Sequence, residues 1–275
     1  MPTPTRRFED SQAVRASVPL LIGLAGPSGC GKTFSALRLA TGMQAVTGGD
    51  VFVLDTEARR SLHYADQFRF RHVPFDAPFS PLDYLAAIEH CVQRGAKIVV
   101  VDSMSHEHEG PGGVLEWHAE ELERLGGSPK VSMLAWQRPK AARRRLLNSI
   151  VQLGISMIFC FRAKEKMKMV KGKDPVPLGW MPIAGPEFVY EMTCSMLLPP
   201  GSKGVPDWHP EHDGERAMTK LPVQFSALDG YSGPLTEKVG ENMAKWAAGG
   251  SAPRGEKVEA RPAEYVDDGL GTGFD

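Results

Sequence analysis

Residues 24–33, LAGPSGCGKT, combine glycine-rich backbone, one ammonium group and one hydroxyl group within ten positions. Gly26, Gly31, Lys32 and Thr33 stand in the spacing G-x-x-x-x-G-K-[ST]. In that spacing, backbone N–H groups and a helix N-terminus surround a phosphate, the lysine reaches the β- and γ-phosphates, and the hydroxyl binds Mg²⁺. The segment therefore predicts a site for ATP with Mg²⁺. We assign nucleotide binding to nine consecutive residues: Gly26, Pro27, Ser28, Gly29, Cys30, Gly31, Lys32, Thr33 and Phe34.

Two acidic residues that follow apolar runs are candidates for the chemistry at the terminal phosphate. Asp102 closes the run KIVVVD, and we expect it to hold Mg²⁺ together with Thr33, through a water molecule. Ser103 occupies the next position, where many ATPases have a glutamate. We therefore assign the base that orients the attacking water to Glu57, just after the run VFVLD. Ligands of such sheets lie beyond the carboxyl ends of the strands, where Glu57 would be.

The pattern of residues 18–248 alternates short apolar runs with stretches of helical spacing. Runs typical of strands occur at 19–25, 51–55, 97–102, 155–161, 191–199 and 216–225. Helical spacing occurs at 33–46, 81–94, 113–125, 138–153 and 235–247. Alternating strands and helices favour a mostly parallel sheet with helices on both faces, so we predict an α/β fold.

The two ends of the chain differ from this core. Residues 1–17 are polar, and we expect a flexible arm; residues 249–275 have few large apolar side chains and more acids than bases, and we expect a disordered acidic tail. No apolar run reaches the ~20 residues that cross a bilayer. The N-terminus lacks a secretory signal pattern, and the four cysteines show no paired spacing. We therefore expect a cytoplasmic protein with reduced thiols and no membrane contact.

The order of the motifs resembles the RecA-like recombinase core over roughly residues 18–225. GPSGCGKT is followed by VFVLDTE, by Tyr-Ala-Asp at 64–66 and by IVVVDS. The stretches IFCFRAKEKMK, LGWMPIAGPEF and YEMTCSMLLPP look more narrowly like a phage group of RecA-like ATPases, called Sak-type, that is linked to single-strand annealing and recombination. A phage-encoded protein would act in the host cytoplasm.

This resemblance implies ATP hydrolysis, with Lys32, Glu57 and Arg162 as the catalytic residues. It places Glu57 in the position of the family's catalytic glutamate. It also places Arg162 at the end of the strand that senses the γ-phosphate, where the family's usual residue is glutamine. In such proteins the sensor strand leads into a mobile loop that contacts DNA.

A basic segment surrounds this sensor position. Between residues 138 and 173 there are eleven lysines and arginines and one acid, Glu165, although the net charge of the chain is −1. Clustered positive charge suits a polyanion, because each neutralised phosphate releases counterions. We predict that a flexible loop after Arg162 binds single-stranded DNA through five lysines: Lys164, Lys166, Lys168, Lys171 and Lys173. Trp180 and Met181 are candidates for stacking on bases, or else belong to a lid or the core.

Further partners and alternatives fit the same motifs. Nucleotides in this family commonly lie between subunits, so the resemblance implies a homo-oligomer, with Lys220 as a candidate contact to the neighbouring site; a single-strand-binding protein is another candidate partner. HEHE at 106–109 is either a loop beside the nucleotide or part of a metal site, and its Glu107 and Glu109 are weaker candidates for the base. The alternative functions are a P-loop kinase for a small molecule and a nucleotide-gated DNA-binding module with negligible turnover.

Overall fold

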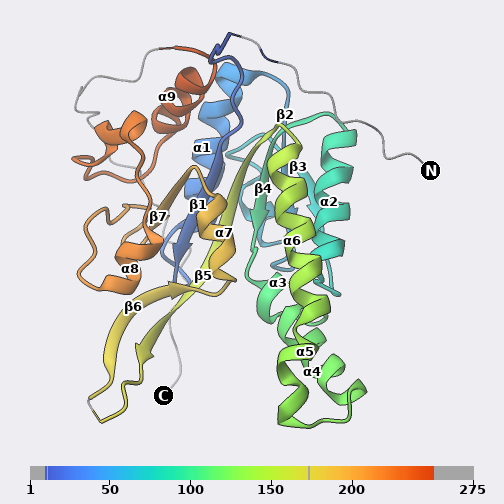
Figure 1. Cartoon of the computed structure of the whole chain (residues 1–275). Helices are drawn as coiled ribbons and strands as arrows, with labels where there is room; N and C mark the ends of the chain where they lie inside the picture. Colours follow the sequence, from blue (N-terminus) through green and yellow to red (C-terminus); the bar gives the residue numbers. More distant parts are fainter. Residues whose placement is uncertain (1–9, 11, 173, 251–275) are drawn as a thin grey trace.

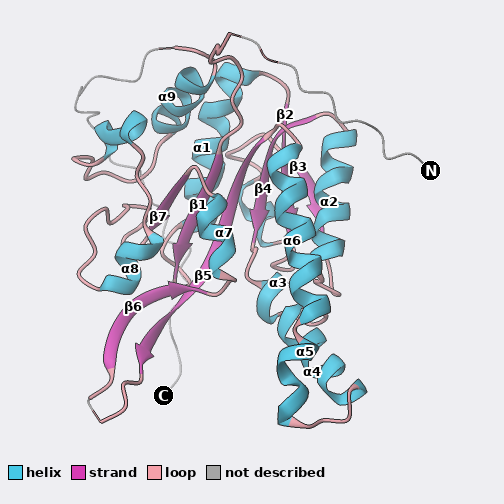
Figure 2. Cartoon of the chain, viewed as in Figure 1, coloured by secondary structure: helices cyan, strands magenta, loops and turns pink. Residues whose placement is uncertain are grey.

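The computed structural model describes residues 10, 12–172 and 174–250, and a central sheet lies between helical layers (Figures 1 and 2). The strands are β1 (Leu21–Gly26), β2 (Asp50–Asp55), β3 (Arg71–Pro74), β4 (Ala96–Asp102), β5 (Ser156–Lys168), β6 (Val176–Pro182) and β7 (Cys194–Leu197). The α-helices are α1 (Lys32–Thr47), α2 (Pro81–Gln93), α3 (His106–Glu109), α4 (Val114–Arg124), α5 (Ser132–Ala135), α6 (Gln137–Gln152), α7 (Pro186–Glu191), α8 (Asp213–Met218) and α9 (Glu237–Ala247). Short 3-10 helices are η1 (Arg60–Tyr64), η2 (Pro129–Val131) and η3 (Val223–Leu228).

The strand order of the sheet is β3-β2-β4-β5-β1-β7, and all of these neighbours pair in parallel. β6 lies off this path and pairs with β5 in the antiparallel sense. A parallel sheet with helices on both faces confirms the predicted α/β fold. The short strand β3 at the edge was not predicted, because its four residues, RHVP, carry little apolar pattern.

The apolar runs are strands that are buried on both faces. Along β4, Ile98 and Val100 belong to the core cluster beneath α1 and α9, whereas Val99 and Val101 belong to the cluster beneath α2 and α6. All four side chains are fully buried. Successive side chains point to opposite faces, so a continuous apolar run suits a strand between two helical layers.

Helices α1 and α9 approach each other unusually closely. A Cβ atom on Gly42 would lie 1.8 Å from the Glu237 carbonyl oxygen, and one on Gly240 would lie 2.1 Å from the Leu39 carbonyl oxygen. Glycine is therefore required on both helices at this contact. Arg38 donates from Nε and Nη2 to Glu237, at 2.8–3.0 Å, beside the same contact. Helix α9 thus supports the helix that begins in the glycine-rich loop.

The predicted strand at 216–225 is wrong. Helix α8 begins at Asp213 because His212 and Glu215 form a reciprocal capping box, and it runs on to Met218. Of the residues that follow, Lys220 forms only an isolated bridge to Ser195 of the edge strand β7. Pro222 has no N–H to donate to a sheet and instead precedes the 3-10 helix η3.

The predicted loop after Arg162 is also wrong, because most of it is a β-hairpin. β5 continues past the sheet to Lys168, and its outer half pairs with β6 from Ala163↔Pro182 to Lys168↔Val176. We call this hairpin, residues 163–182, the ribbon. It extends away from the core (Figure 1), so its sequence lacks the apolar alternation that marks a half-buried strand.

The ribbon and the helical arm formed by α4, α5 and α6 both extend beyond the carboxyl edge of the sheet (Figure 1). Residues 1–9, 11 and 251–275, which include most of the predicted arm and tail, lie outside the described residues. Among the helices that are described, none combines the length and apolar character needed to cross a membrane.

A buried ion pair joins the helical arm to the segment after β4. Arg143 of α6 donates from Nε and Nη2 to the two carboxylate oxygens of Glu107, at 2.9 and 2.8 Å. The side chains are 6% and 0% exposed. Burial raises the pKa of Glu107, whereas the bonds from Arg143 lower it. A charge left without its partner at this depth is costly, so each member depends on the other.

We predict that Arg143→Met destabilises the protein by about 3–5 kcal/mol, because it leaves the Glu107 carboxylate buried and unpaired. The matched control is Arg144→Met, one residue along on the exposed face of α6, which should change stability by less than about 0.5 kcal/mol. Denaturant unfolding measures both. Equal effects of the two substitutions would contradict the prediction.

Candidate nucleotide-binding and catalytic site

The glycine-rich segment forms the turn between β1 and α1. Gly29 and Gly31 have φ angles of 76° and 94°, in the left-handed region that favours glycine. Gly26 is required for a different reason: a Cβ atom there would lie 2.3 Å from the Leu198 carbonyl oxygen and 2.6 Å from the Cys30 sulfur. The loop therefore packs closely against the backbone of Leu198, and the Cys30 side chain is fully buried.

A second segment supports this loop from behind. Gly204 donates its N–H to the Cys30 carbonyl oxygen at 2.8 Å, and Leu198 donates to the Ala25 carbonyl oxygen at 2.7 Å. The turn after β7 thus fixes the loop by backbone contacts. The sequence did not predict this support, because backbone hydrogen bonds can be made by almost any residue type and so give no sequence pattern apart from the glycines.

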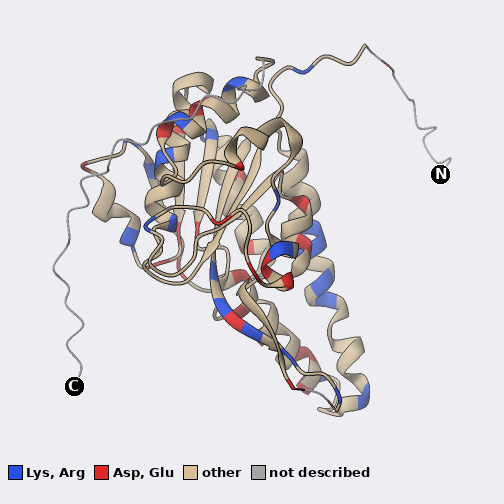
Figure 3. Cartoon of the chain, turned by 90° about the vertical axis from the view of Figure 1, so that its left-hand side faces the viewer, with Lys and Arg blue, Asp and Glu red and all other residues tan. Residues whose placement is uncertain are grey.

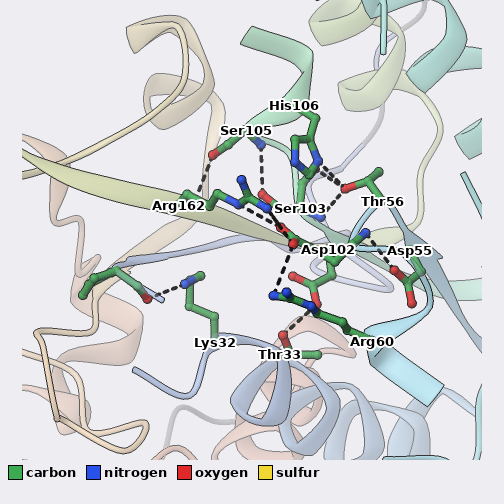
Figure 4. Close-up of polar contacts among 12 residues, drawn as sticks. Lys32, Thr33, Asp55, Thr56, Arg60, Asp102, Ser103, Ser105, His106 and Arg162 are labelled. Carbon is green, nitrogen blue, oxygen red and sulfur yellow. Dashed lines mark hydrogen bonds and ion pairs between the residues drawn. The ribbon is translucent and has the colours of Figure 1, made fainter. Parts of the chain in front are cut away.

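Lys32 and Thr33 lie in the first turn of α1 (Figure 4). The Lys32 ammonium donates to the carbonyl oxygens of Gly26 and Pro27, at 3.0 and 2.7 Å, so it lies across the mouth of the loop. The Thr33 hydroxyl donates to Oδ2 of Asp102 at 2.6 Å. Burial raises the pKa of Asp102 to about 6, and the bond from Thr33 opposes this shift. A hydroxyl and a carboxylate in contact are the oxygen ligands that suit Mg²⁺.

Phe34, the last residue of the predicted nucleotide set, points away from the loop toward a small aromatic cluster. Its ring centroid lies 5.7 Å from that of Tyr64 and 5.3 Å from that of Phe68. The Arg38 guanidinium lies over the same ring at 5.8 Å. The side chain of Phe34 therefore packs against η1 and its neighbours.

Strand register brings the ends of β1, β2 and β4 to one point beside Arg162, which lies within β5. Arg162 of β5 lies opposite Gly26 of β1, Cys160 of β5 lies opposite Asp102 of β4, and Asp102 in turn lies opposite Asp55 of β2. Parallel strands end at the same edge, so side chains distant in sequence meet there.

The segment after β2 turns sharply and returns Glu57 to this edge. The Asp55 carboxylate accepts bonds from the Glu57 N–H at 2.9 Å and from Ser61 N–H and Oγ at 3.0 and 2.5 Å. These bonds, together with one to His72, lower the pKa of Asp55 against the effect of burial. Asp55 therefore holds the turn, which leaves the Glu57 carboxylate for other contacts.

Those contacts are with Arg162. Arg162 donates from Nε to Oε1 and from Nη2 to Oε2 of Glu57, at 2.8 and 2.6 Å. The hydrogen bonds to Glu57 raise the pKa of Arg162. Two residues that the sequence assigned separately to catalysis, 105 positions apart, are thus in direct bidentate contact.

A polar network that the sequence did not predict lies between these elements. The Thr56 hydroxyl accepts from Ser103 N–H at 2.7 Å and lies 2.7 Å from Nδ1 of His106. Burial, then the Arg162 charge, lowers the pKa of His106, whose ring stacks on Phe79 at 4.9 Å. The HEHE segment predicted that residues near His106 lie beside the nucleotide, but nothing in the sequence pointed to Thr56 as their partner.

The same segment does not form the metal site that was considered. Glu107 pairs with Arg143, and Glu109 lies 3.5 Å from the ammonium of Lys164. Within the part of the chain that the structure describes, no group of three or more His, Cys, Asp or Glu side chains has a geometry that could hold a metal ion. Both glutamates therefore pair with cations, as Glu57 does, but only the partner of Glu57, Arg162, lies opposite Gly26 of the phosphate loop.

Lys and Arg residues mark the ribbon in Figure 3, and four of the five predicted DNA-contacting lysines belong to it. Lys164, Lys166 and Lys168 belong to β5, Lys171 lies exposed in the turn, and Lys173 lies outside the described residues. Trp180 and Met181 of β6 are half-buried. The Trp180 N–H donates to Glu215 of α8 at 2.7 Å.

Lys220 forms an isolated antiparallel bridge with Ser195 of the edge strand β7. Its ammonium donates to the carbonyl oxygens of Met192 and Tyr190, at 2.6 and 3.3 Å. The predicted contact with a neighbouring subunit stays a prediction, because these bonds lie within one chain.

Comparisons with known proteins add little to this geometry. No family model matches the chain. No curated protein sequence matches it either. Among solved structures, a KaiC-like protein from Pyrococcus horikoshii OT3 is similar at 16% sequence identity and a TM-score of 0.37, over 68% of this chain and 81% of that chain. At these values the similarity carries no functional inference, so the function is argued from the site.

We predict that Asp102→Asn raises the stability of the protein without nucleotide or Mg²⁺, and does so more at pH 7 than at pH 5. The folded-state pKa of about 6 lies above that of the unfolded chain. The folded protein therefore binds the proton more tightly, and the buried carboxylate destabilises it increasingly as the pH rises through 6. Between pH 5 and pH 7 the unfolded carboxyl is already ionised while the folded one loses its proton, so the difference in unfolding free energy should grow by about 1.3 kcal/mol.

Denaturant unfolding of both proteins across this pH range measures the effect. Asp66→Asn, at an exposed acid, is the control and should show no such trend. A stability difference between Asp102→Asn and the parent that does not change with pH would contradict the prediction.

Proposed function

We propose that this protein is a Mg²⁺-dependent ATPase with a RecA-like core, and that it acts on single-stranded DNA during homologous recombination or strand annealing. The observation that carries the proposal is the convergence of the Lys32 ammonium, the Thr33–Asp102 pair and the Glu57 carboxylate on one edge of the sheet. Such an arrangement supplies each group that phosphoryl transfer to water requires.

The roles follow from charge and position. Backbone N–H groups of the loop and the start of α1 would surround the β-phosphate, and Lys32 would leave the loop carbonyls for the β- and γ-phosphate oxygens. Mg²⁺ held by Thr33 and Asp102 would neutralise charge on the same phosphates. Glu57 would accept a hydrogen bond from the attacking water and orient it, and Arg162 would contact the terminal phosphate.

Single-stranded DNA is the proposed second ligand because of the charge of the ribbon. Four lysines between residues 164 and 171 face one acid, Glu165, on a hairpin that extends away from the core. Their charge favours a phosphate backbone. β5 carries three of these lysines, Lys164, Lys166 and Lys168, on the same strand as Arg162, so the DNA contact and the sensor are joined by continuous backbone.

A nucleotide-gated DNA-binding module with negligible turnover is the second candidate function. The observation that favours it is the bidentate contact between Arg162 and Glu57, which occupies the proposed base. ATP hydrolysis measured with and without single-stranded DNA separates the two functions: turnover at background level in both conditions would favour the module.

We predict that Lys32→Ala reduces ATP hydrolysis by at least about a hundredfold and also weakens ATP binding, because it removes the cation that contacts the phosphates.

Glu57→Gln should reduce turnover by about 10²–10⁴ while ATP binding persists, because the amide cannot act as a base. Phosphate release and nucleotide titration measure these effects. Near-normal turnover in Glu57→Gln would reassign the base.

We predict that replacing Lys164, Lys166 and Lys168 by Ala weakens binding of single-stranded DNA. Each lost phosphate contact should reduce the slope of log affinity against log salt by about 0.7. Fluorescence anisotropy with a labelled oligonucleotide at several salt concentrations measures both quantities. The matched control, with three charges removed from α6, is Lys140→Ala/Arg144→Ala/Arg145→Ala. An unchanged slope in the ribbon variant, or an equal change in the control, would contradict the prediction.

A further inference from the structure

Arg162 and Glu57 form the most complete ion pair at the candidate site. Both guanidinium–carboxylate contacts are short, at 2.8 and 2.6 Å, and they use both oxygens of the carboxylate. The Glu57 side chain is 13% exposed, whereas that of Arg162 is 42% exposed. Arg60 approaches the same carboxylate only distantly, at 3.8 Å, and its side chain is 71% exposed. Arg162 is therefore the main partner of Glu57.

The backbone of Arg162 is fixed beside the phosphate loop. Its residue lies opposite Gly26 in the strand register. Its N–H donates to the Ser105 hydroxyl at 2.9 Å, and its carbonyl oxygen accepts from the Ile183 N–H at 2.7 Å. The part of Arg162 that can move is thus the side chain, whose root stands next to the point where the phosphates of a nucleotide would lie.

Guanidinium forks bind carboxylates and phosphates with the same bidentate geometry. The fork of Arg162 cannot present the same N–H groups to both anions at once. A terminal phosphate that takes the Nε–Nη2 edge of the guanidinium, the edge now held by Glu57, would therefore compete with Glu57 for Arg162. A nucleoside diphosphate brings no terminal phosphate to that position and would not compete in this way.

We propose that Arg162 is a positioning residue that holds Glu57 until a triphosphate arrives, and we call this contact the latch. The terminal phosphate draws the guanidinium away and releases the carboxylate to orient water. With ADP or no nucleotide, the latch stays closed. This inference rests on the proposed function and adds to it the order in which the site is assembled: the phosphate that is to be cleaved is the signal that frees the base.

The latch has a thermodynamic consequence that does not depend on turnover. Opening it costs free energy, so the affinity for a triphosphate is lower than it would be without the latch, whereas the affinity for ADP is unaffected. Glu57→Gln removes the carboxylate partner and frees Arg162 in advance. It should therefore tighten binding of a triphosphate relative to ADP.

The test is a double-mutant cycle on the full-length chain, read out by calorimetric titration with Mg²⁺ and either a non-hydrolysable ATP analogue or ADP. Glu57→Gln should raise the preference for the ATP analogue over ADP roughly tenfold, which corresponds to about 1.4 kcal/mol. In the Arg162→Gln background, the same substitution should leave this preference unchanged, because there is no latch to open.

The Arg162→Gln background also separates the latch from simple repulsion. If the Glu57 carboxylate merely repelled the terminal phosphate, Glu57→Gln would raise the preference in both backgrounds, and the latch would be refuted. An unchanged preference in the parent background would refute it as well. Arg60→Gln is the matched control: the tenfold effect should persist in that background, because Arg60 makes only the longer contact.

Binding also distinguishes this failure from failure of the proposed function. If the parent protein binds neither nucleotide, the proposed ATPase is wrong; if it binds both but Glu57 does not influence the preference, only the latch is wrong. Retained ADP affinity shows that each variant is folded at the site. If Arg162→Gln does not fold, Arg162→Lys replaces it, and the effect of Glu57→Gln should shrink because an ammonium cannot make the bidentate contact.

Discussion

The 2.6 Å hydrogen bond from the Thr33 hydroxyl to the Asp102 carboxylate joins the first turn of α1 to the end of β4, and β5 lies between β4 and β1 in the sheet. It depends on two separate constraints. First, the loop must turn tightly enough for α1 to begin at Lys32. Second, β4 must be buried on both faces, so that the carboxylate at its end, Asp102, is shielded from water. Burial disfavours the ionised form of Asp102 and thereby raises its pKa. The charges of Glu57, Lys32 and Asp55 also act on the Asp102 carboxylate.

Charge near the site is arranged in pairs that differ in depth. Arg143 and Glu107 are almost wholly buried and join the helical arm to the core, so their contact is structural. Arg162 and Glu57 lie nearer to the surface, and one partner is almost half exposed. An exposed guanidinium can exchange one anion for another at a lower desolvation cost than a buried one. The buried Arg143–Glu107 pair should therefore stay intact, whereas Arg162 can exchange Glu57 for another anion.

The parts of the site that the sequence predicts are those in which one short stretch determines the geometry. Gly26 to Thr33 form the loop, and Asp102 and Glu57 follow apolar strands whose ends had to meet at one edge of a parallel sheet. The contact of Glu57 with Arg162 could not be predicted in this way, because it depends on strand order and on side-chain conformation across 105 positions. The ribbon was missed because a hairpin in solvent carries no apolar alternation. The strand predicted at 216–225 failed because a local capping box and a proline outweighed a moderate apolar pattern.

The close contact of Gly42 with the α9 backbone has a consequence for the order of events during synthesis. Helix α1 follows the first strand, whereas α9 ends at Ala247, about two hundred positions later. Helix α1, the proposed phosphate-binding helix, is therefore completed by one of the last described segments to leave the ribosome. A nascent chain that has emerged only as far as β5 already contains every side chain proposed to act on the nucleotide, yet it lacks the support beneath them. The close approach of Gly42 to the α9 backbone therefore implies that the proposed nucleotide site is completed late in translation.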